Sequence, residues 1–113
     1  MSEWLVACLC AEWCGSCREY HAAFEAAARE LSGAARFAWI DIEDEPEVLG
    51  DLEITDFPSL LIARGDEVAF YGSVTPQPGT LARLVRRAVA GELGVVRDAA
   101  VAGLASRARA AIG

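Results

Sequence analysis

Cys14 and Cys17 are the residues of this 113-residue chain that point most directly to chemistry. Two thiols at this spacing can exchange with a disulfide, because one thiolate attacks a sulfur of the disulfide and the second thiol resolves the mixed disulfide. An apolar run over residues 4–10 precedes the pair, and a stretch with helical periodicity over residues 20–31 follows it. The pair therefore falls where a strand turns into the first turn of a helix. The positive end of the helix dipole favours a thiolate there, above all at Cys14.

The elements that must position this pair follow from the apolar pattern. Seven consecutive apolar residues predict a strand over 3–10 that is buried on both faces. Apolar residues three and four apart behind it predict a helix over 16–32. The remaining elements that the pattern predicts are strands over 36–42, 59–64 and 67–71, a short helix over 46–52 that begins with a proline, and a helix over 80–90. The element order is β-α-β-α-β-β-α.

Composition and charge exclude several classes of function. The formal net charge of −7 argues against a nucleic-acid partner. No apolar run approaches the ~18 residues that a membrane span needs, so we expect no membrane association. Met1 leads into the first strand without a basic leader segment, which indicates a cytoplasmic protein. In that compartment, four cysteines indicate catalysis or metal binding more than structural disulfides.

Residues 3–91 resemble the thioredoxin family in three segments. Residues 11–17, AEWCGSC, resemble its active-site segment; residues 54–59, ITDFPS, resemble the segment that holds its cis-proline; and Gly72 falls where the family has a glycine after the last strand. The resemblance implies an α/β, thioredoxin-like three-layer fold with a central mixed four-stranded sheet flanked by helices. It also implies a thiol–disulfide oxidoreductase whose redox group is its own disulfide, without another cofactor or a metal.

The resemblance assigns roles to individual positions. Cys14 would be the attacking thiol and Cys17 the resolving thiol. Pro58, if cis, would expose the backbone of Phe57 for pairing with an extended substrate segment. The implied partners are protein disulfides and a protein or small-thiol reductant, and a monomer is expected. The apolar surface that would contact the substrate consists of Trp13, Gly15, Phe57 and Gly72.

Departures from the family pattern concern the tuning of the thiols. Cys8 stands where typical members have a buried aspartate that helps to deprotonate the resolving cysteine, and Cys10 stands where they have a tryptophan. A buried thiol does not replace a carboxylate as a base, so we expect slower release of the reduced substrate. Ser16 stands where the family usually has proline, and we expect it to raise the redox potential. Trp39 stands where a lysine often lies beneath the active site, and the N-terminal strand and helix of typical members are absent.

Cys8 and Cys10 allow more than one interpretation. They alternate on a buried strand and therefore point to the same face, where packing is the simplest role. Cys10 could instead form an alternative disulfide or be a target for oxidation. A metal or iron–sulfur site could use Cys8, Cys10, Cys14 and Cys17, although thiols on a buried strand do not converge as a tetrahedral site requires. A third alternative is a thioredoxin-like binding adaptor, against which the intact dithiol motif argues.

The segment 92–113 lies beyond the thioredoxin-like domain, which we place at residues 1–91. Its apolar residues recur at helical spacing and predict one amphipathic helix or a frayed tail. Such a helix would cover the sheet face that the missing N-terminal elements leave open, or pair with another subunit. The acidic residues 41–47 are expected to form a solvated rim, and His21 is expected on a solvated helix surface.

Overall fold

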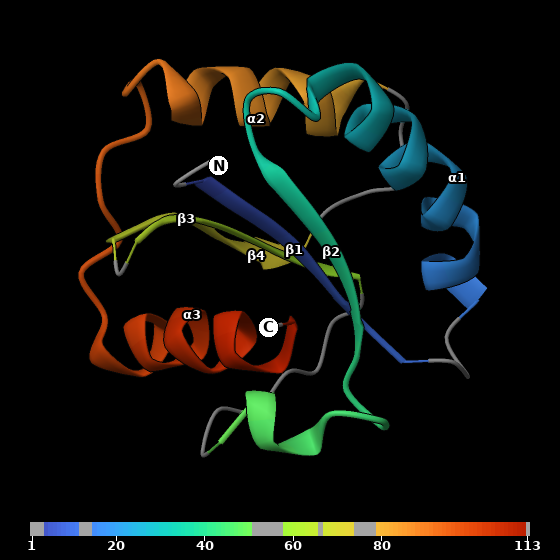
Figure 1. The fold of residues 1–113 in the computed structure, drawn as a ribbon, viewed down its shortest axis with the longest axis vertical. Coiled ribbons are helices and arrows are strands. Elements are labelled where there is room, and N and C mark those ends of the chain that lie inside the picture. Colours follow the sequence, from blue (N-terminus) through green and yellow to red (C-terminus); the bar gives the residue numbers. More distant parts are fainter. Residues whose placement is uncertain (1–3, 12–14, 51–57, 66, 74–78, 113) are drawn as a thin grey trace.

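The computed structural model describes residues 4–11, 15–50, 58–65, 67–73 and 79–112, with the exception of the Ser16 side chain. Its strands and helices alternate along the chain much as the apolar pattern predicts (Figure 1). The elements are β1 (Trp4–Cys10), α1 (Gly15–Leu31), β2 (Arg36–Asp41), the 3-10 turn η1 (Pro46–Val48), β3 (Ser59–Arg64), β4 (Glu67–Ser73), α2 (Thr80–Val89) and α3 (Ala99–Ile112).

The four strands form one mixed sheet in the order β2-β1-β3-β4. β1 runs parallel to β2 and antiparallel to β3, and β3 and β4 form an antiparallel hairpin. Helices α1 and α2 cover one face of the sheet and α3 covers the other (Figure 1). This arrangement confirms the predicted three-layer α/β fold with a four-stranded mixed sheet.

β1 is continuously apolar because both of its faces are covered. Val6, Cys8 and Cys10 pack with α1 and α2, while Leu5 and Leu9 pack with α3 on the opposite face. Successive side chains of a strand point to opposite faces, so neighbouring residues of β1 belong to two separate apolar layers.

Helix α3 lies against the face of the sheet opposite to α1 and α2. Its Leu104 is fully buried together with Leu5 and Leu9 of the central strand. Arg107 fastens the helix to η1, because its Nε donates to the Val48 carbonyl oxygen at 2.7 Å and its Nη2 donates to the Leu49 carbonyl oxygen at 3.0 Å. The remaining buried residues of α3 are Val101, Ala105 and Ala108.

Three element boundaries differ from the sequence prediction. The short helix predicted over 46–52 is a 3-10 turn, Pro46–Val48, in the described residues, and Gly50 ends the turn with a φ of +56°. The last strand extends to Ser73, so that Gly72 lies within it rather than after it. The final helix begins only at Ala99 rather than near residue 93.

The late start of α3 has a local cause. Gly94 adopts a φ of +75°, which a helix cannot contain. Val96 then donates its N–H to the Val68 carbonyl oxygen at the edge of β4, and the Oδ1 of Asp98 accepts the Ala100 N–H at 2.9 Å as a helix cap. Within the described ranges, every helix is too short or too polar to cross a membrane.

Candidate functional site

One end of the sheet gathers most of the described residues that the sequence singles out. The carboxyl ends of β1, β2 and β4 meet the amino end of β3 there, because β3 alone runs in the opposite direction. Cys10 ends β1, Pro58 directly precedes β3, and Gly72 pairs with Leu60 near the end of β4. Helix α1 begins after β1 and runs back over the face of the sheet on which Cys8 and Cys10 lie (Figure 1).

Cys17 lies in the first turn of α1 and is almost completely buried, with 2% of its surface exposed. It packs in the same apolar layer as Cys8 and Cys10. The backbone N–H groups of a first helical turn have no partner within the helix, so the Cys17 sulfur sits where negative charge is stabilised. Gly15 is exposed at the start of the same helix.

Several predicted site residues fall outside this description. Trp13, Cys14 and Phe57 do not belong to the described ranges, and neither does the side chain of Ser16. Their expected roles therefore stay predictions.

Cys8 and Cys10 form a pair of contacting thiols. Their Sγ atoms lie 3.3 Å apart, and the two residues are 0% and 2% exposed. Tyr20, one helical turn after Cys17, is buried on the same side of the sheet. Burial raises the pKa of its hydroxyl above the usual range, and charge on Cys8 and Cys10 raises it further. The Tyr20 hydroxyl therefore stays protonated beside the two sulfurs and is able to donate a hydrogen bond.

A cavity of about 240 Å³ connects this thiol layer with the surface. Two of its lining residues are Cys10 and Cys17, so both sulfur-bearing side chains border the same space. Its wall also contains an acidic side chain, Asp41, and two basic ones, Arg18 and His21. The cavity therefore offers the buried sulfurs a route for protons and small molecules. The other described residues of the wall are Ala11 and Trp39.

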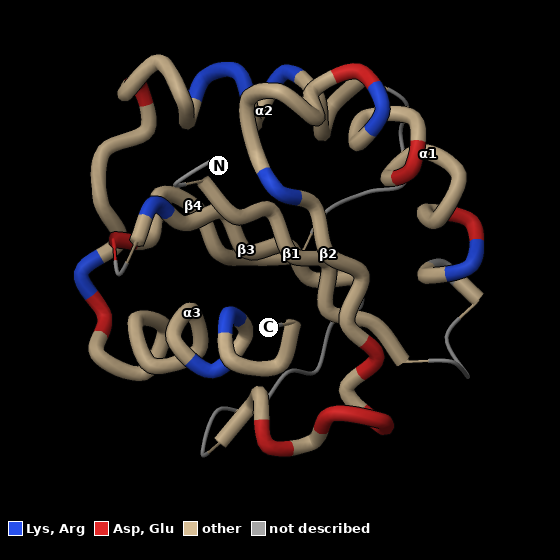
Figure 2. The backbone as a smooth tube through the Cα atoms, in the orientation of Figure 1, with Lys and Arg blue, Asp and Glu red and all other residues tan. Residues whose placement is uncertain are grey.

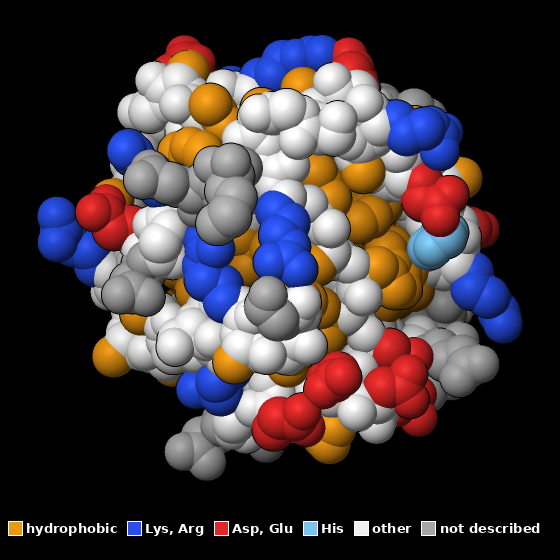
Figure 3. Space-filling view, viewed as in Figure 1, with side chains coloured by type: hydrophobic (Ala, Val, Ile, Leu, Met, Phe, Trp, Pro, Cys, Tyr) orange, Lys and Arg blue, Asp and Glu red, His pale blue; other side chains and the backbone are white. Residues whose placement is uncertain are grey.

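Trp39 forms the outer wall of this cavity from the edge strand β2. It pairs with Cys8 in the parallel register, and its ring meets His21 edge-on at 4.7 Å and Phe24 at 5.5 Å between centroids. Figure 3 shows apolar side chains gathered beside the histidine, between β2 and α1. His21 itself is exposed and lies 3.3 Å from the Glu25 carboxylate, as expected for a residue on a helix surface.

Pro58 and Gly72 have different exposure at the same sheet end. Pro58 is fully buried and Ser59 is 3% exposed, whereas Gly72 is partly exposed and without a side chain to cover the backbone. Among the described residues, a Cβ added at Gly72 would come within 4 Å of the Phe70 ring alone, at 3.7 Å. A larger side chain at this position would therefore meet little of the described part of the chain.

Acidic residues surround the end of β2 beside the site. Figure 2 shows the acidic positions following one another from β2 into η1, and Figure 3 shows acidic side chains together on this part of the surface. Glu43 donates its backbone N–H to the Asp41 carboxylate at 2.8 Å, which fixes the turn. The neighbouring Glu47 raises the pKa of the Glu45 carboxyl. The rim is therefore strongly negative.

Sequence reasoning did not single out Tyr20 or Asp41 as parts of the thiol environment. Tyr20 could have been found, because its spacing of three from Cys17 puts both residues on one helix face. Asp41 could not, because its approach depends on the parallel pairing of β1 with β2.

Metal binding gains no support from the described side chains. Within the ranges given above, no three His, Cys, Asp or Glu residues are arranged to hold a metal ion. Cys8, Cys10 and Cys17 all lie within these ranges.

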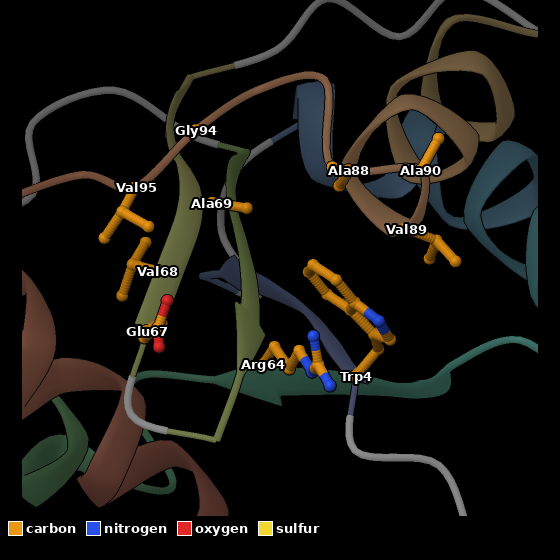
Figure 4. A pocket seen from close by; sticks show the side chains of 11 residues that line it. Trp4, Arg64, Glu67, Val68, Ala69, Ala88, Val89, Ala90, Gly94 and Val95 are labelled. Carbon is orange, nitrogen blue, oxygen red and sulfur yellow. The ribbon is translucent and has the colours of Figure 1, made fainter.

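A second cavity, of about 360 Å³, lies at the opposite end of the sheet. Figure 4 shows the indole of Trp4 beside Arg64 and facing the end of α2 near Val89. None of the described residues that line this cavity is a cysteine, and it lies at the end of the sheet away from Cys10 and Cys17.

Known proteins resemble the chain over the same elements. The thioredoxin family model matches residues 2–86. The candidate thioredoxin 2 of Streptomyces coelicolor is 37% identical over 71 residues, which cover 63% of this chain and 48% of that protein. Thioredoxin of Listeria monocytogenes is 33% identical over 58 residues, which cover 51% of this chain and 56% of that protein. The chain thus matches about half the length of these curated relatives.

Solved structures show the same fold. Thioredoxin of Trypanosoma brucei brucei superposes with a TM-score of 0.66 at 25% identity, covering 77% of this chain and 75% of that chain. Chloroplastic thioredoxin z superposes with a TM-score of 0.68 at 23% identity, covering 78% of this chain and 80% of that chain.

Proposed function

Because the chain belongs to the thioredoxin family, we propose that it exchanges dithiol for disulfide on protein substrates through Cys14 and Cys17. Thiol–disulfide oxidoreduction is the general activity that this family membership supports. The observation that carries the specific assignment is the position of Cys17, which is almost fully buried in the first turn of α1 at the end of β1. A buried second thiol at a helix start is suited to resolve a mixed disulfide rather than to attack a substrate.

The proposed reaction has two exchange steps. The thiolate of Cys14 attacks one sulfur of the substrate disulfide, and the other substrate sulfur leaves with the electron pair and takes a proton from solvent. Cys17 then attacks the Cys14 sulfur, which releases the second substrate thiol. The substrate gains two electrons and two protons, and the enzyme keeps the disulfide until a reductant of the thiol class reopens it.

Deprotonation of Cys17 requires a base that the buried thiol of Cys8 does not supply. Asp41 is an ionisable group in the cavity that Cys17 also lines. We infer that water in this cavity carries the proton from Cys17 to the Asp41 carboxylate. Asp41→Asn keeps the oxygen that accepts the Glu43 N–H and removes the base, so it should slow the second step with the fold unchanged. If Asp41→Asn and the unmodified chain carry out that step at the same rate at every pH between 6 and 8, this route is excluded.

Substrate contact is proposed at Pro58, Phe57 and Gly72, with Trp13 and Gly15 around the sulfurs. The partial exposure of Gly72 at the end of β4, beside the start of β3, supports this assignment. The negative rim at the end of β2 supports a preference for substrates with basic residues near the disulfide. That preference should weaken with added salt, because the rim is exposed.

The direct test is reduction of insulin disulfides with dithiothreitol as the electron donor. We expect activity in the unmodified chain and none in Cys14→Ser. Cys17→Ser should instead accumulate a mixed disulfide between Cys14 and the substrate. A folded chain without any insulin reduction would contradict the proposal and favour a binding adaptor of the same fold.

A further inference from the structure

The proposed reaction makes no use of two thiols that lie directly beneath it. Cys8 and Cys10 are buried side by side on β1, with their sulfur atoms 3.3 Å apart. Packing alone does not require two sulfur atoms in contact in this layer, since an apolar side chain of similar size would fill either position. The contact is instead close to the geometry from which two thiols can bond.

The strand geometry allows this bond but strains it. Residues two apart on a strand have Cα atoms about 6.6 Å apart, whereas disulfides span about 4.4–6.8 Å. A Cys8–Cys10 disulfide would therefore close with small side-chain rotations and some compression of the strand. Strained disulfides are more easily reduced than relaxed ones, so this pair should be oxidised only after a relaxed pair has closed.

The cavity provides a connection between the pair and Cys17. Cys10 and Cys17 line the same space, while Cys8 is 0% exposed and lies behind Cys10. Cys10 can therefore exchange with Cys17, whereas Cys8 is reached only through Cys10. The protonated Tyr20 hydroxyl beside both sulfurs is able to stabilise a thiolate formed there.

We propose that Cys8 and Cys10 are a second redox pair, which is oxidised to a disulfide through Cys17. The proposal rests on the proposed function, because the oxidant is the Cys14–Cys17 disulfide. The Cys10 thiolate attacks the Cys17 sulfur, and Cys14 leaves with the electron pair and takes a proton from solvent. Cys8 then attacks the Cys10 sulfur, and Cys17 leaves as a thiolate that takes up a proton. Cys8 and Cys10 lose the two electrons and two protons that Cys14 and Cys17 gain.

This transfer gives the chain a fully oxidised form with two disulfides. It also returns Cys14 and Cys17 to the dithiol state after a first oxidation, so that they can accept a second one. The buried pair thus registers more oxidising conditions than those that close the first pair, without itself meeting the external oxidant.

The test is a titration of the whole chain in glutathione buffers of rising oxidation, with acid quenching, alkylation of the unfolded protein and mass spectrometry. Of the four cysteines, we expect two to close first and the other two to close later, with Cys8 and Cys10 linked in the peptide map. Cys8→Ala and Cys10→Ala should each show only the first step and keep one alkylated thiol. Both variants place a small apolar side chain in an apolar layer, and circular dichroism checks their fold.

Three results would overturn the inference. If Cys14 and Cys17 close while Cys8 and Cys10 stay alkylated throughout, the second pair does not exist and the proposed function still stands. If Cys14 and Cys17 never close, the proposed function itself is wrong. The route is tested with Cys17→Ser, in which the Cys8–Cys10 disulfide should form at least about tenfold more slowly because its exchange partner is gone; an equal rate would refute the transfer through Cys17.

Discussion

Truncation of Leu104 to alanine tests whether α3 holds the second face of the sheet. Leu104 is fully buried in the apolar layer that also contains Leu5 and Leu9 of β1. The substitution removes three carbon atoms, which at about 0.8 kcal/mol each lose roughly 2.4 kcal/mol of burial. The cavity left behind brings the expected loss in the free energy of unfolding to about 3–5 kcal/mol. Leucine and alanine differ little in helix propensity, so the loss reports packing.

The measurement is urea unfolding followed by tryptophan fluorescence. A domain of this size is stable by only about 5–15 kcal/mol, so the urea midpoint of Leu104→Ala should fall substantially. The control is Val89→Ala on α2, where the side chain is 39% exposed, and we expect a change within about 0.5 kcal/mol there. If Leu104→Ala lowers the free energy of unfolding by less than about 1 kcal/mol, the packing of α3 on the sheet would be refuted.

Three further predictions concern other contacts of the same fold. Arg107→Met should lower the free energy of unfolding by about 2 kcal/mol, because the Val48 and Leu49 carbonyl oxygens lose a charged donor; Arg83→Met, on an exposed position of α2, is the matched control in urea unfolding. Cys8→Asp should speed release of the reduced substrate in stopped-flow assays, because a buried carboxylate nearby can take the Cys17 proton. An unchanged release rate would show that the lack of a carboxylate at position 8 does not limit this step. In an alkaline titration of tyrosinate absorbance, the folded chain should ionise at higher pH than the urea-unfolded chain. Burial raises the pKa of Tyr20 and of Tyr71, so stability should be unaffected below about pH 10 and fall above it as the unfolded tyrosines ionise; coincident curves would show that both hydroxyls are solvated.

Much of the fold could be predicted from the spacing of the apolar residues along the chain. The continuous apolar run of β1 required two covered faces, and the spacing of Tyr20 and Phe24 placed α1 against one of them. The common face of Cys8 and Cys10 followed from strand alternation. Their 3.3 Å contact did not, because it depends on the side-chain rotamers, which strand alternation does not determine.

The C-terminal boundary shows where the pattern failed. Leu93 and Val96 continue the apolar period of α3, yet Gly94 takes a positive φ and Val96 pairs with Val68 instead. Period alone does not report the sign of φ at a glycine. The bonds from Arg107 to the carbonyls of Val48 and Leu49 were equally beyond prediction, because they join residues more than fifty positions apart.

The alternation of β1 has a consequence for how this chain can be altered. Even-numbered positions such as Val6, Cys8 and Cys10 belong to the apolar layer that contains Cys17. Odd-numbered positions such as Leu5 and Leu9 belong to the layer that contains α3. Substitutions one residue apart should therefore separate into two groups, one that shifts the redox potential and one that shifts only the unfolding midpoint. Substitutions in the α3 layer can therefore raise or lower the stability of this protein while its sulfur chemistry is left as it is.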